Sequence, residues 1–83
     1  MKIALADLPW PFLAETRVVA QAANGHWHDL TSVIAETGLE GAPTSKELPA
    51  MLAFLSSLNA GALRKVQHAL GERKNGVPNP ALL

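Results

Sequence analysis

The apolar residues between positions 48 and 58 constrain the fold of this chain more than any other feature of its sequence. They recur at the spacing of one helical face: Leu48, Met51, Leu52, Leu55 and Leu58. Residues 44–47 match a capping box, although Pro49 indicates that the regular helix begins at Leu48 or Pro49. Because further apolar residues fill much of the helix circumference, we expect a central helix that other elements cover on several sides.

Two earlier segments also have helical patterns with marked ends. Residues 11–23 carry apolar side chains on one face, begin with a proline and end at Asn24-Gly25, which suits a helix terminus. Residues 30–37 follow Asp29, a good helix N-cap, and precede Gly38, a common C-terminal residue. Both segments are therefore predicted to be helices.

A fourth helix is predicted to begin after Asn59. Its buried face would consist of Leu63, Val66 and Leu70, and residues 72–76 are its outer limit. The two prolines of residues 77–80 prevent a helix there, so we expect residues 77–83 to form an extended tail.

These patterns predict an all-α protein, a small compact bundle of about four short helices with an extended C-terminal tail. The helical domain would span residues 1–76 and the tail residues 77–83. Residues 2–6 suit a short strand, but a lone strand needs a partner, and the segments interpreted as helices supply none. The 83-residue chain has no cysteine, so packing alone must stabilise its small core.

Composition and motifs exclude several classes of function. Without cysteine there is no thiolate nucleophile and no Cys-based metal site, and no phosphate-binding loop or GxSxG motif occurs. We therefore predict no enzyme activity and no cofactor. The N-terminal apolar run is too short for a signal peptide, and no apolar stretch is long enough to span a membrane. A cytoplasmic location is the simplest interpretation.

His26, His28 and Asp29 are the one cluster of residue types that ligate metals. In an extended segment, alternate side chains share a face and can hold a divalent cation. The competing interpretation is a polar loop between two helices, which requires no ligand. We adopt the loop and predict no metal site.

Charge is distributed unevenly along a chain whose formal net charge is zero. Residues 1–42 have two basic and five acidic residues, and residues 43–83 have the reverse. The basic half supplies four candidates for contact with nucleic acid: Arg64, Lys65, Arg73 and Lys74. Residues 30–39 resemble the first helix and turn of a helix-turn-helix, but the next helix lacks the side chains that read base edges. A DNA-binding regulator is therefore the alternative function.

Aromatic residues favour a different class of function. Trp10 lies between two prolines and is followed by Phe12, and Trp27 adds a second large ring outside the main apolar faces. Tryptophan is enriched in binding hot spots because it buries a large area at low entropic cost. We therefore predict a non-enzymatic interaction module, such as a regulator, adaptor, inhibitor or assembly subunit, that binds a protein or a second copy of itself through Trp10, Phe12 and Trp27. The alternative is that both tryptophans complete the core.

Overall fold

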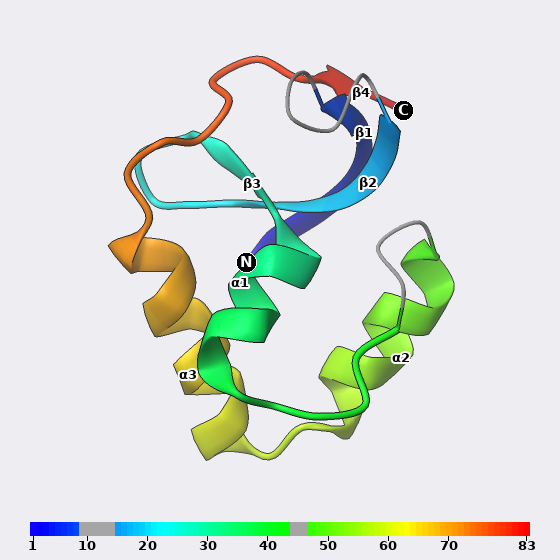
Figure 1. Cartoon of the computed structure of the whole chain (residues 1–83), viewed down its shortest axis with the longest axis vertical. Coiled ribbons are helices and arrows are strands. Elements are labelled where there is room, and N and C mark those ends of the chain that lie inside the picture. The colour runs from blue at the N-terminus through cyan, green and yellow to red at the C-terminus, as the bar shows by residue number, and fades with distance from the viewer. Residues whose placement is uncertain (9–14, 44–46) are drawn as a thin grey trace.

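The computed structural model describes residues 1–8, 15–43 and 47–83, and it shows an α+β fold (Figure 1). A four-stranded antiparallel sheet has the order β3-β2-β1-β4, and the helices lie together on one side of it (Figure 1). The strands are β1 (Lys2–Leu8), β2 (Glu15–Gln21), β3 (Trp27–Asp29) and β4 (Ala81–Leu82), and the helices are α1 (Leu30–Thr37), α2 (Leu48–Ser57) and α3 (Ala60–Glu72). The prediction of an all-α bundle was therefore wrong.

The error begins at residues 15–21, which form strand β2 where a helix over 11–23 was predicted. Val18 and Val19 are both fully buried, Val18 against the helices and Val19 in a second cluster. Successive strand residues point to opposite faces, so a strand that is covered on both faces has no apolar alternation. Its adjacent valines mimic a helical pattern. Residues 9–14 of the predicted helix lie outside the described residues.

Strand β1 has the partner that the sequence analysis could not find. It pairs with β2 along its whole length, from Lys2 opposite Gln21 to Leu8 opposite Glu15. Because β2 was interpreted as a helix, residues 2–6 were left without a neighbour in the prediction. The helix predicted at β2 and the missing partner of β1 therefore have the same cause.

The helix termini were predicted more accurately. The Asp29 side chain accepts a hydrogen bond from the Ser32 backbone N–H at the start of α1, and Gly38 ends that helix with a φ of 75°. Asn59 likewise caps α3 by accepting from the Ala62 backbone N–H. The predicted helices at 30–37 and after Asn59 are confirmed. In the described part of the chain, no helix has the length and apolar character needed to cross a membrane.

Helix α2 begins at Leu48, as predicted, with Pro49 in its first turn. It is not the central, widely covered helix that was expected. Only Met51 and Leu55 are buried, and Leu52 has 44% of its surface exposed. Residues 44–46 of the predicted capping box lie outside the described residues.

Two apolar clusters lie on opposite faces of the sheet. The larger cluster, between the sheet and the helices, consists of Val18, Ala20, Leu30, Val33, Ile34, Met51, Leu55, Val66 and Leu70. The smaller cluster consists of Ala6, Leu8, Val19 and Trp27, with Val77 packed against it. Both faces of the sheet therefore carry buried apolar side chains.

Residues 77–82 pair with the two strands, β3 and β1, that flank β2. Val77 exchanges two backbone hydrogen bonds of 2.9 Å with Trp27 at the outer edge of β3. Ala81 and Leu82 then pair with Asp7 and Ala6 at the edge of β1. The chain between these contacts passes over the sheet end drawn at the top of Figure 1. The segment predicted as a tail is extended, but it is part of the sheet.

Gly76 provides a test of how tightly this segment packs. An alanine Cβ at this position would lie 2.5 Å from His26 Cβ and 2.7 Å from His28 Nε2. We expect Gly76→Ala to lower the free energy of unfolding by about 1–3 kcal/mol, the usual cost of overpacking. Gly71→Ala is the control, because nothing lies within 4 Å of its added Cβ in α3, and it should stabilise the chain by about 0.5–1 kcal/mol. Urea unfolding followed by circular dichroism measures both, and equal stabilities would contradict the packing described.

Candidate functional site

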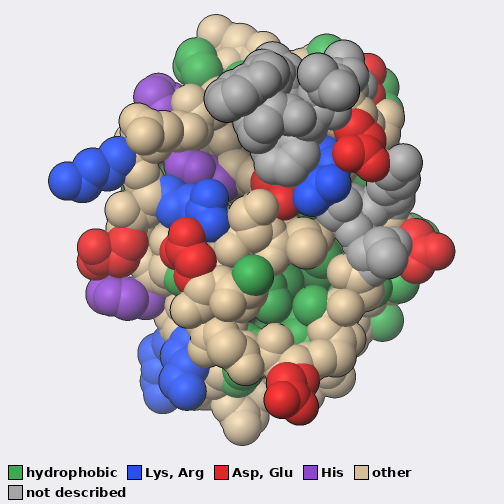
Figure 2. Space-filling view, viewed as in Figure 1, with side chains coloured by type: hydrophobic (Ala, Val, Ile, Leu, Met, Phe, Trp, Pro, Cys, Tyr) green, Lys and Arg blue, Asp and Glu red, His purple; other side chains and the backbone are tan. Residues whose placement is uncertain are grey.

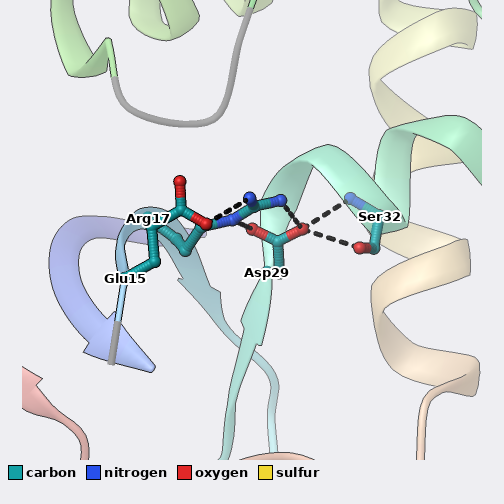
Figure 3. Close-up of polar contacts among 4 residues, drawn as sticks. All are labelled: Glu15, Arg17, Asp29 and Ser32. Atoms are coloured by element: carbon teal, nitrogen blue, oxygen red, sulfur yellow. Dashed lines mark hydrogen bonds and ion pairs between the residues drawn. The ribbon is translucent and has the colours of Figure 1, made fainter. Parts of the chain in front are cut away.

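A bidentate ion pair joins β2 to the start of α1 (Figure 3). Arg17 donates two parallel hydrogen bonds to Asp29, Nε to Oδ1 at 2.9 Å and Nη2 to Oδ2 at 3.0 Å. The Asp29 side chain is only 3% exposed and the Arg17 side chain 17%. Asp29 Oδ2 also accepts from the Ser32 backbone N–H at 3.0 Å and from the Ser32 hydroxyl at 2.6 Å. One carboxylate thus caps a helix and neutralises a buried cation.

The electrostatics of this cluster stabilise the charged form of the arginine. The hydrogen bonds that Arg17 donates to Asp29 raise the pKa of Arg17 above its usual value, while burial acts in the opposite direction. Glu15 contributes a weaker contact, with its Oε2 3.4 Å from Arg17 Nη1. These contacts join strand β2 to the end of β3 and the start of α1.

His26, His28 and Asp29 do not form the polar loop that was predicted. His28 and Asp29 lie in β3, and His28 is only 5% exposed. Burial lowers the pKa of His28, with nearby Arg73 and His26 acting in the same direction and Glu36 opposing them. Asp29 is already bonded to Arg17 and Ser32. Across residues 1–8, 15–43 and 47–83, no group of three or more such side chains is placed to hold a metal ion.

A polar pocket of about 260 Å³ lies where β3, α1 and the end of α3 meet. It is lined by His28, Glu36, Glu72, Arg73, Lys74 and Asn75. Arg73 Nη2 donates to Glu36 Oε1 at 2.7 Å, so the main cation of the pocket already has an anionic partner. On the α3 side of the molecule, Figure 2 shows side chains of both charge signs interspersed with histidines.

The four basic candidates for nucleic-acid contact are distributed over two places. Arg64 and Lys65 are exposed on α3, whereas Arg73 and Lys74 follow that helix at the polar pocket. Arg73 is paired with Glu36 across 37 positions of the sequence. A role for these residues in nucleic-acid binding stays a prediction.

Of the three aromatic candidates, Trp27 is the one in the described part of the chain. Trp27 is 9% exposed and belongs to the smaller apolar cluster. Trp10 and Phe12 lie outside the described residues. A role for the three in partner binding also stays a prediction.

An apolar groove of about 320 Å³ is the exposed feature that sequence analysis missed. It lies between the start of β1, α2 and α3 and is lined by Met1, Ile3, Leu52, Leu55, Ser56, Leu63 and Gln67. Leu52 is 44% exposed and Met1 46%, and no lining side chain is charged. Leu52 was predicted to be buried because of the helical spacing around it. Spacing identifies the residues that share one face of a helix, but it does not show whether other elements cover that face.

The Arg17–Asp29 pair can be tested separately from the helix cap. Asparagine caps helices as well as aspartate does, so Asp29→Asn keeps the cap but removes the negative charge to which the Arg17 guanidinium is bonded. We expect a loss of about 3–5 kcal/mol in the free energy of unfolding, as for other broken buried pairs. Asn59→Ala, which removes only the α3 cap, should cost about 1 kcal/mol. If chemical denaturation gives the same loss for both variants, the ion pair is not a major source of stability.

His28 gives the fold a predictable pH dependence. Because its pKa in the folded chain lies below the ordinary value of 6.5, the unfolded chain binds the proton more readily and acid favours unfolding. We compare the free energy of unfolding between pH about 7.5 and about 5.5. Below the pKa of the unfolded chain, the free energy of unfolding of wild type should fall by up to about 1.4 kcal/mol per pH unit, and that of His28→Gln should fall less. The control is His68→Gln, whose histidine side chain is 78% exposed and which should behave like wild type. Equal acid sensitivity of all three chains in urea titrations would show that His28 is not responsible.

Comparison with known proteins adds no assignment to these sites. No known protein family, curated protein or solved structure matches the chain.

Proposed function

We propose that this chain is a small, non-enzymatic, cytoplasmic interaction module that binds a partner protein through the apolar groove. The observation that carries the proposal is the exposure of Leu52 and Met1 beside a groove lined mainly by apolar side chains. Covering such side chains contributes about 25 cal/mol for each Å² of apolar surface removed from water. A contiguous apolar surface of this kind is typical of a protein-binding site.

The lining of the groove favours a protein segment over a small polar ligand. Small-molecule sites combine apolar walls with a few polar groups that fix the orientation of the ligand. Here the two polar lining residues are Ser56 and Gln67, and the Ser56 hydroxyl donates to the Leu52 carbonyl oxygen of its own helix. Gln67 alone would have to orient a small ligand. Apolar side chains of a partner require no such groups.

The absence of an enzyme activity and the cytoplasmic location belong to the same proposal. The best-formed polar cluster, Arg17 with Asp29, is occupied with its own contacts and with the α1 terminus. His28, the most buried histidine, is nearly inaccessible to a substrate. A chain without cysteine also fits a reducing compartment, where disulfides are rare. Regulator, adaptor, inhibitor and assembly subunit are all roles that such a module can have.

Binding to peptides selected from a random library displayed on phage tests the groove. We expect Leu52→Glu to weaken the selected peptides at least about tenfold, because it replaces a buried apolar contact with a charge. Ala53→Glu is the matched control, since it adds the same charge to the neighbouring exposed position of α2 without altering the groove lining. Its affinity should stay within about twofold of wild type, and both variants should keep the wild-type melting temperature within a few degrees. Equal affinities for the two variants, or no enriched peptide, would refute the proposal.

A further inference from the structure

Strand β1 is only partly covered on the side that faces β4. On its other side, β2 pairs with β1 from Lys2 to Leu8. On the β4 side, pairing reaches only Asp7 and Ala6, followed by one hydrogen bond from the Leu83 N–H to the Leu5 carbonyl oxygen at 2.9 Å. Among the described strands, none pairs with this side of β1 before Leu5. The first part of β1 therefore has an edge that no described residue pairs with, referred to here as the open edge.

The backbone of Ile3 faces this open edge. In an antiparallel pair, alternate residues direct both their N–H and their C=O toward the same neighbouring strand. Because the Leu5 carbonyl oxygen accepts from Leu83, the backbone groups of Ile3, two residues earlier, point to that side as well. Unpaired groups of this kind are a template for another strand. An added strand that continued the line of β4 would reach them directly.

The open edge and the apolar groove share residues. Ile3 presents its backbone at the edge and contributes its side chain to the groove, and Met1, immediately before β1, also lines the groove. Strand addition draws affinity from main-chain hydrogen bonds and specificity from pockets that take alternate side chains. Both components are present beside Ile3.

We propose that the docking segment of the partner is an extended chain that adds to the open edge of β1. This inference rests on the proposed function and specifies how the groove is used. The segment runs antiparallel to β1, in line with β4, bonds to the Ile3 backbone, and places every second side chain in the groove. Those side chains are apolar, because the groove lining is mainly apolar and includes no charged side chain.

Charge specifies the partner further. Arg64 is exposed on α3 three residues before Gln67 of the groove lining, so the two side chains are neighbours on the helix surface. Helix α2, which supplies Leu52 and Leu55, has no charged residue between Leu48 and Ser57. Acidic side chains flanking the apolar positions of the segment would therefore be attracted, and basic ones repelled.

The first test uses the phage-selected peptides as probes, with single backbone N-methyl groups placed at each position in turn. An edge-bound strand directs only alternate N–H groups toward β1, so affinity should fall about tenfold or more at every second position and little between them. The enriched peptides should also be richer in aspartate and glutamate than the starting library. If the positions at which N-methylation lowers affinity do not alternate along the peptide, as expected for a helical peptide, the proposal is overturned.

The second test follows the protein itself by amide hydrogen exchange in NMR. The Ile3 amide should exchange quickly in the free chain and become protected at least about tenfold when the peptide binds. The Ala4 amide is the internal control, because it faces β2 and should be protected with or without peptide.

The outcomes separate this inference from the proposed function. Peptides that lose affinity in Leu52→Glu but leave the Ile3 amide unprotected would keep the groove as a binding site and overturn strand addition. Peptides that bind Leu52→Glu as tightly as wild type would overturn the proposed function itself. Protection of Ile3 in the absence of peptide, together with a dimer in sedimentation equilibrium, would assign the edge to a second copy of this chain and overturn a separate partner.

Discussion

The fold depends on the two parallel hydrogen bonds between Arg17 and Asp29. Asp29 is the point where strand β3 becomes helix α1, and its carboxylate also caps that helix through Ser32. By holding Asp29 to β2, Arg17 fixes where α1 leaves the sheet, and Leu30, Val33 and Ile34 of α1 fill the larger cluster. A buried charge without its partner is costly, so the pair also disfavours other registers between these strands.

The sequence revealed the elements whose signals are local. Asp29, Gly38 and Asn59 mark helix ends because a cap acts within a few residues, and all three lie at the termini that they predicted. The strands depend on partners far along the chain. The pairing of Ala6 with Leu82, or of Trp27 with Val77, leaves no local pattern that sequence analysis can detect. Adjacent buried valines then favoured a helix where both faces of a strand are covered.

At the groove, too, the sequence predicted local structure correctly but not the contacts between distant parts of the chain. The spacing of Leu52, Leu55 and their neighbours predicted a helix correctly, but exposure depends on what other elements cover. Helix α2 packs through Met51 and Leu55, and Leu52 remains at the surface. Trp27 is the opposite case. Its ring belongs to none of the predicted helical faces, yet it is buried in the smaller cluster on the second face of a sheet that was not predicted. The groove requires three elements, and only two of them were predicted.

The attachment of residues 77–82 to both sheet edges affects the order in which the chain can complete its fold. Synthesis runs from the N-terminus, so β1, β2 and β3 leave the ribosome well before Val77 and Leu82. Until those residues emerge, the nascent sheet has two unprotected edges, and such edges invite pairing with other chains. Pauses in translation before position 77 would prolong that vulnerable interval. The segment that pairs with part of each edge strand in the native sheet thus sets how long the growing polypeptide remains prone to aggregation.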